Sequence, residues 1–421
     1  MAGSLHGLFN TKRLLIVSIV LTVLVVSLTY NWFISNIGKE EEKPGFIPIV
    51  YANTLDAYTS FSLELLEKIG FGEKNTVVSP LSIYIALLML SEGAHGSTRE
   101  ELLNALHLRD LEEARIWFKN LLYRLRNKTS DKAILEIGNS VWVKKYFNVN
   151  KSYVRLLINN YLAEYYNFTS IYRVVDRVNE WVNNKTHGLI DKIIDYGDID
   201  ELTLILLINT LYFKANWTKP FEYIETEEFH TINGTVKTDF LVGEMYIHYL
   251  EENNYVAVAL SYRGTSIKFV AIMPKNGDLK GFIEEIGYAG LLDILHKLFE
   301  SKRRSVELHI PMFDIDSGKI DLKNILYEMG IREVFDKTKS DLRYMIASKE
   351  YTPGLLYVKN VFHRARMKIT LSGTEAGAAT FIGVKALGYV ESVKFDKPFL
   401  FLLVEPSEYT ILFAGSYVSP Q

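Results

Sequence analysis

An uninterrupted apolar run in the middle of the chain constrains the fold most. Residues 204–208 read Leu-Ile-Leu-Leu-Ile, and the run continues past Asn209 to Leu211, Tyr212 and Phe213. Neighbouring side chains of a strand point to opposite faces, so a strand that is apolar at every position has to be covered on both faces. The run therefore predicts a central strand of a sheet that carries a layer on each side.

Helical signals dominate the part of the chain before this run. Ser79-Pro80 precedes an apolar stretch that Gly93 ends, which predicts a helix capped by Ser79 with proline at its first position. Thr98 and Glu101 have the spacing of a capping box, so we expect a second helix to begin there. Apolar residues also repeat at helical spacing over residues 174–182.

Strand signals dominate the later part of the chain. Residues 399–404 and 411–413 are apolar and are separated by turn residues, which predicts a hairpin. Helices followed by strands indicate a mixed α+β fold, and 48% hydrophobic residues provide a sizeable core. A net charge of -3 gives no reason to expect a nucleic-acid partner. The absence of cysteine excludes disulfides and thiol catalysis.

The N-terminus carries a segment that is long and apolar enough to cross a bilayer, at residues 14–34. Lys12 and Arg13 precede it, which favours an N-terminus inside the cell. No small-x-small cleavage site follows it, so an uncleaved anchor is favoured over a cleaved signal, whose removal would give a secreted protein. We expect a cytoplasmic segment at 1–13, the transmembrane anchor or signal at 14–34, a charged stalk at 35–47, and a folded domain at 48–421 outside the cytoplasm.

The sequence gives no positive sign of catalysis. It lacks an H-E-x-x-H zinc motif, a phosphate loop and a G-x-S-x-G elbow. Ser79, Ser82 and His363 could be read as nucleophiles and a base, but a helix cap explains Ser79 better, and no acid is indicated to orient His363. Acidic residues are placed on charged faces, so no acid–base pair stands out. We expect no enzyme, no cofactor and no metal site.

Basic residues gather at 302–304 and at 109–128. Either stretch could bind a polyanion. Acidic residues are interleaved with the second stretch, which favours an ordinary solvated face.

A segment rich in glycine and alanine near the C-terminus needs a separate explanation. Residues 373–386 read Gly-Thr-Glu-Ala-Gly-Ala-Ala-Thr-Phe-Ile-Gly-Val-Lys-Ala. If this segment is extended, one face is small or apolar and the other holds both charges, Glu375 and Lys385. It could therefore enter a sheet as a central strand. It could equally stand as an exposed loop, and its composition alone favours a plain linker.

From about residue 48 to the end, the chain resembles the serpins, a family of serine protease inhibitors. Five motifs occur in the order found in that family. They are V-V-S-P-L-S at 77–82 with G-A-H-G-S-T-R-E at 93–100, N-E-W-V-N-N-K-T-H-G at 179–188, L-I-N-T-L-Y-F-K-A-N-W at 207–217, F-D-K-P-F at 395–399, and I-L-F-A-G at 411–415. The resemblance implies an α+β serpin fold with three β-sheets, an exposed reactive-centre loop and a monomeric protein.

The resemblance also assigns site residues. Ser79, Ser82, Asn209 and His363 would belong to the polar shutter beneath the main sheet, and Trp217 would lie at the breach where the loop first enters. The hinge of inhibitory members would be Gly373, Thr374, Glu375, Ala376, Gly377, Ala378 and Ala379. Small residues are needed there because the strand has to slide between two existing strands.

Counting along the loop from either end places the cleaved bond between Leu387 and Gly388. A leucine at this position suits chymotrypsin-like or subtilisin-like proteases. Lys385 or Tyr389 would give a different specificity if the cleaved bond lies next to one of them instead. The target's nucleophile would attack Leu387, and loop insertion would then trap the covalent complex. The alternatives are a non-inhibitory binding or chaperone protein of the same fold, and an inhibitor of cysteine proteases.

One pair of positions departs from the pattern of inhibitory members. These usually carry an acidic residue two positions before the hinge glycine, paired with a lysine on a neighbouring strand. Leu371 and Met312 occupy those positions here. We expect a hydrophobic contact in place of the ion pair, which need not abolish inhibition because such replacements are often neutral or stabilising.

Overall fold

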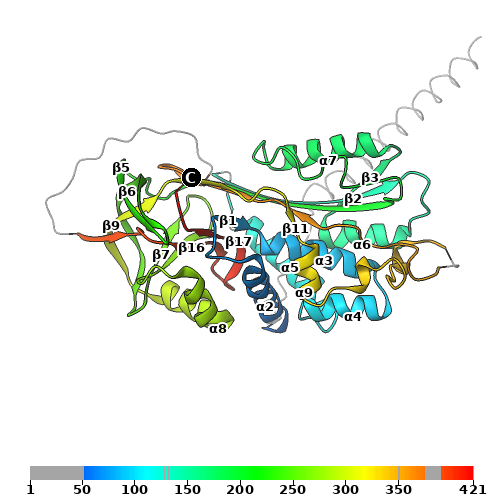
Figure 1. Ribbon diagram of the computed structural model, residues 1–421, viewed down its shortest axis with the longest axis horizontal. Coiled ribbons are helices and arrows are strands. Elements are labelled where there is room, and N and C mark those ends of the chain that lie inside the picture. Colours follow the sequence, from blue (N-terminus) through cyan, green and yellow to red (C-terminus); the bar gives the residue numbers. More distant parts are fainter. Residues whose placement is uncertain (1–51, 128, 131, 349–350, 375–389, 421) are drawn as a thin grey trace, which may run out of the picture. The chain divides into compact units, whose positions relative to one another are not determined.

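The described part of the chain forms helices and sheets between Ala52 and Tyr417 in the computed structural model (Figure 1). The structure describes residues 52–127, 129–130, 132–348, 351–374 and 390–420. The expected cytoplasmic segment, anchor, stalk and domain start near residue 48 all lie outside these residues. Within the described ranges, no helix is both long and apolar enough to cross a membrane.

The described helices have the following bounds. They are α2 (Ala52–Ile69), α3 (Pro80–Gly93), α4 (Gly96–Ala105), α5 (Leu111–Asn127), α6 (Lys151–Tyr161), α7 (Ile171–Lys185), α8 (Leu279–Glu300), α9 (Lys323–Glu328), and the short 3-10 helices η1 (Glu333–Phe335) and η2 (Arg343–Met345).

The described strands fall into three sheets. The six-stranded sheet has the order β10-β13-β14-β4-β2-β3, the nine-stranded sheet has the order β1-β17-β16-β8-β7-β6-β9-β15 with β5 on β6, and β11 pairs with β12. Their bounds are β1 (Thr76–Val78), β2 (Ala133–Lys144), β3 (Glu164–Phe168), β4 (Ile205–Asn216), β5 (Tyr223–Thr231), β6 (Gly234–Glu251), β7 (Tyr255–Ser261), β8 (Lys268–Pro274), β9 (Arg303–Pro311), β10 (Phe313–Asp316), β11 (Ile320–Asp321), β12 (Phe362–His363), β13 (Arg366–Ile369), β14 (Gly373–Thr374), β15 (Glu391–Lys394), β16 (Phe399–Glu405) and β17 (Thr410–Tyr417).

The helix predicted after Ser79 is confirmed. The Ser79 side chain accepts the Ser82 N–H, Pro80 is the first helical residue, and α3 runs to Gly93 with nearly every side chain buried. Buried residues of α7, including Val174 and Trp181, repeat as the sequence predicts.

The capping box predicted for the next helix is wrong. Helix α4 begins at Gly96, before Thr98, and its first residues have no side-chain cap. Thr98 is buried, and its hydroxyl accepts the Asp341 N–H at 3.0 Å. Glu101 accepts the N–H groups of Arg332 and Glu333. Both side chains therefore bind a segment more than 200 residues away instead of their own helix.

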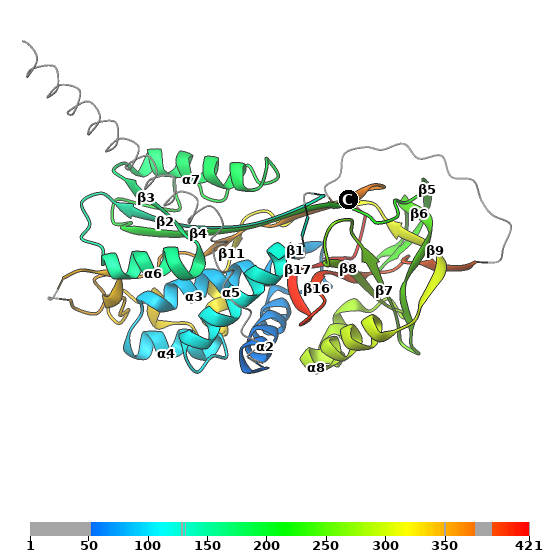
Figure 2. The ribbon, with the colours of Figure 1, turned by 180° about the vertical axis from the view of Figure 1, so that it is seen from behind.

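The apolar run at 204–208 forms part of β4, as predicted. β2 pairs with β4 in antiparallel register from Val143–Ile205 to Ala133–Ala215. Helix α7 covers one face of this sheet, and α3 and α6 lie on the other (Figures 1 and 2). The late hairpin is also confirmed, because β16 and β17 are antiparallel neighbours with a register shift between Leu403 and Val404. The α+β fold with three sheets is thus as predicted.

Candidate functional site

The six-stranded sheet is bridged at one end and open along much of its centre. β14 lies between β13 and β4, and Thr374 pairs with Ile369 on one side and with Ala215 on the other. From Ile205 to Lys214, the only described pairing of β4 is with β2. A cavity of about 210 Å³ lies beside this edge, lined by Leu204–Asn209 on one side, by residues 355–363 on the other, and by α3 beneath. Over residues 205–214, the edge of β4 that faces this cavity therefore has no described strand beside it.

The start of the predicted hinge lies at the closed end of this opening. A Cβ on Gly373 would meet the Ala215 carbonyl oxygen at 2.1 Å, so only glycine fits there. Thr374 is buried, and its hydroxyl bonds to the Tyr262 hydroxyl. The remaining hinge positions and the proposed Leu387–Gly388 bond lie outside the described residues.

The residues on either side of the undescribed segment 375–389 belong to different sheets. Gly373 and Thr374 form β14 in the six-stranded sheet, whereas the chain resumes at Val390 and enters β15. β15 pairs in parallel with β9 at the edge of the nine-stranded sheet. The segment that contains the proposed bond thus connects two sheets.

The four predicted shutter residues lie together beneath the opening. The Ser82 hydroxyl donates to Asn209 Oδ1. Asn209 Nδ2 donates to Asn139 Oδ1 at 2.5 Å, and Asn139 Nδ2 donates to the Tyr161 carbonyl at 2.7 Å. This chain of hydrogen bonds joins α3, β4, β2 and α6. Sequence reasoning missed Asn139, although it is a polar residue within the strand that pairs with β4, directly opposite Asn209.

His363 joins the same cluster from the other side of the opening. Its Nε2 accepts the backbone N–H of Ser79 at 3.1 Å, and the Ser79 hydroxyl donates to the Leu412 carbonyl at 2.8 Å. Burial lowers the pKa of His363 to about 4, which keeps the ring neutral and able to accept. Because the Ser79 hydroxyl bonds to a carbonyl instead of to the ring, this geometry is not that of a nucleophile and its base.

Trp217 lies where the opening meets β14. Its backbone N–H donates to the Ser372 carbonyl at 2.9 Å, and its Nε1 donates to the Thr370 carbonyl at 3.0 Å. Its ring stacks on Tyr262 with centroids 4.4 Å apart. Tyr262, which sequence reasoning also missed, bonds to Thr374. The two aromatic residues therefore hold Thr370, Ser372 and Thr374, at the start of the predicted hinge and just before it.

Leu371 and Met312 have different surroundings. Leu371 packs against the main core, and its carbonyl accepts the Phe221 N–H. Met312 is 37% exposed, and its N–H donates to the Asp239 carbonyl. The hydrophobic contact expected between the two side chains stays a prediction.

Three described acidic residues, Glu92, Asp341 and Glu405, are buried instead of lying on charged faces, contrary to the sequence prediction. Glu92 is buried and accepts Arg115 Nε at 2.6 Å and the Tyr161 hydroxyl at 2.8 Å. Glu405 is fully buried, 3.8 Å from Arg124 Nε. Both arginines belong to the basic stretch of α5, and turning them inward compensates the buried carboxylates.

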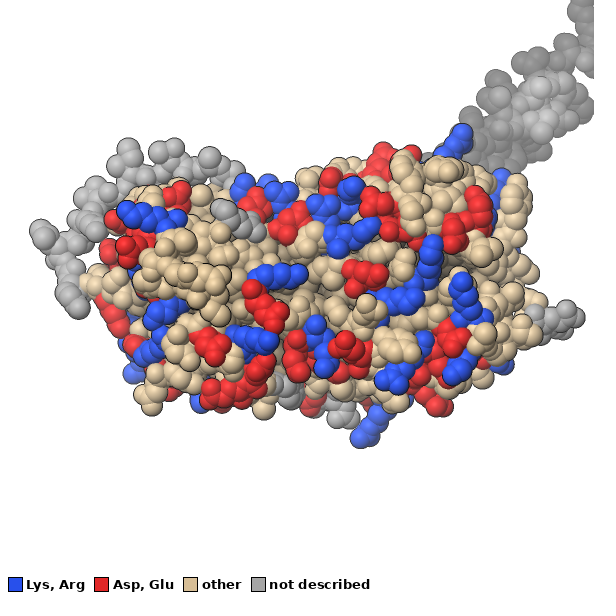
Figure 3. Space-filling model, in the orientation of Figure 1, with Lys and Arg blue, Asp and Glu red and all other residues tan. Residues whose placement is uncertain are grey.

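On the face that Figure 3 shows, positive and negative side chains are interspersed, as expected for an ordinary solvated surface. In the basic run at 302–304, Arg304 lies 3.6 Å from Glu391 and over the Tyr249 ring. Among the described side chains, no three acidic or histidine residues are grouped so as to hold a metal ion.

Sequence comparison gives a family match over most of the chain. A family model described as serpin (serine protease inhibitor) matches residues 56–420. An uncharacterized serpin-like protein from Thermococcus kodakarensis is 28% identical over 379 residues, covering 87% of this chain and 86% of its own length. Alpha-1-antichymotrypsin from Pongo abelii is 31% identical over 368 residues, covering 83% of each chain.

Solved structures give the same result. The native-state crystal structure of the thermophilic serpin tengpin matches with a TM-score of 0.77 at 26% identity, over 87% of this chain and 94% of that one. Serpin48 from the insect Tenebrio molitor matches with a TM-score of 0.75 at 25% identity, over 89% and 100% of the two chains.

Proposed function

The chain belongs to the serpin family, and on that premise we propose that it is a suicide inhibitor of serine proteases and not itself an enzyme. The observation that carries the proposal is the open edge of β4, beside which Gly373 and Thr374 already form a short strand. The segment that follows has one small, uncharged face when extended, so it can continue β14 along that edge without placing a charge inside.

The chemistry of inhibition would begin as ordinary proteolysis. The protease serine attacks the Leu387 carbonyl carbon, the bond to the Gly388 nitrogen breaks, and that nitrogen leaves with the proton of the serine hydroxyl. The protease is then held to Leu387 as an ester. Insertion of residues 375–386 along β4 would draw the ester and the enzyme away from Val390, which remains next to β15, and would deform the oxyanion site before water attacks.

Leucine at the cleaved bond favours proteases with apolar pockets, as in chymotrypsin-like and subtilisin-like enzymes. Residues 14–34 would hold the inhibitor to a membrane, with the serpin domain outside the cytoplasm. Such an arrangement would limit inhibition to proteases that reach that surface.

Mixing the full chain with chymotrypsin, subtilisin or trypsin tests the proposal. We expect an SDS-resistant complex with the first two proteases and a released peptide that begins at Gly388. Turnover as a plain substrate, with no complex and no gain in heat stability after cleavage, would refute inhibition and favour a non-inhibitory binding protein. A complex with papain, a cysteine protease, would widen the target class.

Two neighbouring substitutions separate insertion from cleavage. Ala376→Arg places a charge on the face that has to turn inward, so we expect cleavage without a stable complex. Glu375→Arg changes a residue on the opposite face, so the complex should persist. Equal loss of complex in both variants would contradict the alternation on which the insertion model rests.

A further inference from the structure

A second cavity lies between two helices on the other side of the domain core. Helices α2 and α8 lie next to each other in both views of the ribbon (Figures 1 and 2), and the cavity between them has a volume of about 270 Å³. This size is close to the lower limit of small-molecule sites, which is about 300 Å³. The cavity shares no lining residue with the opening beside β4, so it is a separate site.

A break in α8 explains the open space. Gly287 has a φ of 52° and a ψ of -161°, so the helix does not continue regularly through it. Glycine adopts this positive φ without a steric clash because it has no Cβ. The two halves of α8 therefore change direction at Gly287, next to α2. A Cβ added at this position would meet no other atom within 4 Å, which agrees with a cavity at the break.

The inner part of the cavity is apolar. It is formed by Leu66 of α2, Phe71 just after that helix, Leu291 of α8 and Leu400 of β16, which are buried in the apolar cluster between the helices and the nine-stranded sheet. Leu63 packs against the same cluster but is only partly buried. An apolar group placed in the cavity would remove this remaining surface from water, which favours binding.

The outer part of the lining is acidic. Glu64 and Glu67 lie on α2 and Glu284 lies on α8, and we call these three residues the acidic rim. Glu64 is 3.1 Å from His107 Nε2, and Glu67 is 4.0 Å from Lys68 Nζ. Glu284 is exposed and forms no ion pair with any residue that the structure describes. The rim therefore carries more negative charge than the cations beside it compensate.

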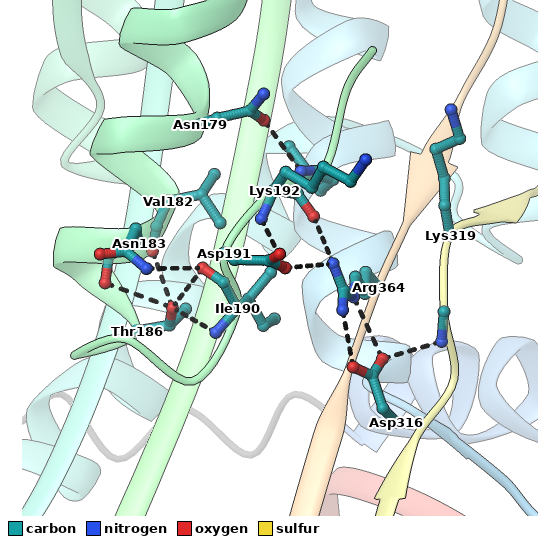
Figure 4. A network of polar contacts seen from close by, with 12 residues as sticks. Asn179, Val182, Asn183, Thr186, Ile190, Asp191, Lys192, Asp316, Lys319 and Arg364 are labelled. Atoms are coloured by element: carbon teal, nitrogen blue, oxygen red, sulfur yellow. Dashed lines mark hydrogen bonds and ion pairs between the residues drawn. The ribbon is translucent and has the colours of Figure 1, made fainter.

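Acidic side chains elsewhere in the protein have cations directly opposite them. In the network of Figure 4, for example, Arg364 Nη1 lies 2.6 Å from Asp191 Oδ1. Lys280, one turn before Glu284, donates instead to Glu73 at 2.6 Å. The end of the first half of α8 adds to the negative potential, because the C-terminus of a helix carries partial negative charge. A ligand with a positive end would complement this surface.

We propose that the cavity between α2 and α8 binds a small amphipathic cation, in which an apolar ring or short chain carries a protonated amine. The apolar part lies against Leu66, Phe71 and Leu400, and the amine lies among the carboxylates of the acidic rim. Because such a ligand contacts two helices and the nine-stranded sheet at once, it stabilises the folded domain. The site is independent of the proposed inhibition.

Four small probes added to the full chain test the ligand class. Phenethylamine is the cation, phenethyl alcohol and phenylacetate are its neutral and anionic counterparts, and butylamine keeps the charge without the ring. Titration calorimetry should give phenethylamine a Kd on the order of 1 mM. The alcohol should bind about threefold more weakly, and phenylacetate and butylamine about tenfold more weakly or less. Hydrogen–deuterium exchange with phenethylamine should show protection at residues 60–67 and 283–291.

Substitutions in the rim locate the charge. Glu67→Gln and Glu284→Gln should each weaken phenethylamine binding about threefold, and the double variant about tenfold, the size expected for exposed charges. Binding of phenethyl alcohol should not change in any of them. The matched control is Glu285→Gln, which removes the neighbouring exposed carboxylate outside the lining and should leave both affinities unchanged.

Preference for the cation, together with its loss in the rim variants but not in Glu285→Gln, supports the proposal. It is overturned by no binding of phenethylamine at about 10 mM, by equal binding of phenethylamine and phenylacetate, or by protection outside α2 and α8. A dimer in solution that Leu63→Glu dissociates would assign the cavity to a second copy of the chain and would also overturn it. None of these results depends on whether the chain inhibits a protease.

Discussion

Acidification from pH 7 to pH 5 should destabilise the native state through one buried imidazole, that of His363. The ring is buried beneath the opening and accepts the Ser79 N–H, so it needs an unprotonated Nε2. Protonation would place a charge next to a donor, without a counter-ion among its described hydrogen-bond partners. The pKa is lowered from 6.5 to about 4 by burial.

The sign and size of the effect follow from proton linkage. Once unfolding exposes the ring, it binds a proton near pH 6.5, whereas the native state resists protonation down to about pH 4. The unfolded state therefore holds more protons between these values, and stability is lost as the pH falls through that window. At pH 5, which is about 1.5 units below the pKa of the unfolded imidazole, protonation favours the unfolded state and lowers the free energy of unfolding by about 2 kcal/mol.

Urea unfolding of wild type and of His363→Gln at pH 7 and pH 5 measures this effect. Glutamine can present an acceptor near the position of Nε2 but does not titrate in this range. The loss of unfolding free energy on acidification should be about 2 kcal/mol smaller in the variant, while other titrating groups cancel in the comparison. Equal pH dependence in wild type and His363→Gln would refute the reasoning.

Three further substitutions test close packing and buried polar contacts. Gly373→Ala should lower the free energy of unfolding by about 2 kcal/mol or more, because the added Cβ would lie 2.1 Å from the Ala215 carbonyl oxygen. Urea midpoints would show this loss, and a neutral effect would contradict the close approach. Asn139→Ala should cost about 1–3 kcal/mol, since it leaves the Tyr161 carbonyl and the Asn209 amide without their partner, and a thermal shift of under one degree would argue against the network. Glu92→Ala should lower the free energy of unfolding by about 3 kcal/mol, because it leaves Arg115 without its buried partner. Asp293→Ala, which removes an exposed pair with Lys297 on α8, should change the free energy of unfolding by less than about 1 kcal/mol.

Local patterns predicted those parts of the fold whose partners are close in sequence. Ser79 caps α3 through the N–H of Ser82, three residues away, so its sequence neighbours suffice to reveal it. The Thr98 and Glu101 pattern failed because both side chains bind the backbone of residues 332–341. The same residue types at the same spacing can form a capping box or a long-range contact, and only the tertiary structure distinguishes the two.

The residues of the candidate site also differ in how far the sequence alone reveals them. Asn209 interrupts an apolar run and is noticeable in the sequence, whereas its partner Asn139 lies 70 positions earlier and gains meaning only from the β2–β4 register. Tyr262 is one aromatic among many until its hydroxyl is found beside Thr374. Glu92 was expected on a charged face because nothing nearby in sequence signals the arginine that compensates it.

The apolar run that constrains the fold is incompletely covered at its start. Ile205, Leu206 and Leu207 are partly exposed, whereas Tyr212 and Phe213, nearer the bridge formed by β14, are buried. A strand that is apolar at every position is typical of the interior of a sheet that is covered on both faces, and the described pairing gives residues 205–214 a neighbouring strand, β2, on one edge. Under the proposed function, a strand added at this edge would cover more of these side chains and pair the backbone groups beside them, which would make the sheet with the extra strand the more stable one. If the proposed insertion occurs, the free energy that drives it would come from this incomplete burial, and polar substitutions at Leu206 or Leu207 should weaken the gain in heat stability on cleavage more than they weaken the uncleaved protein.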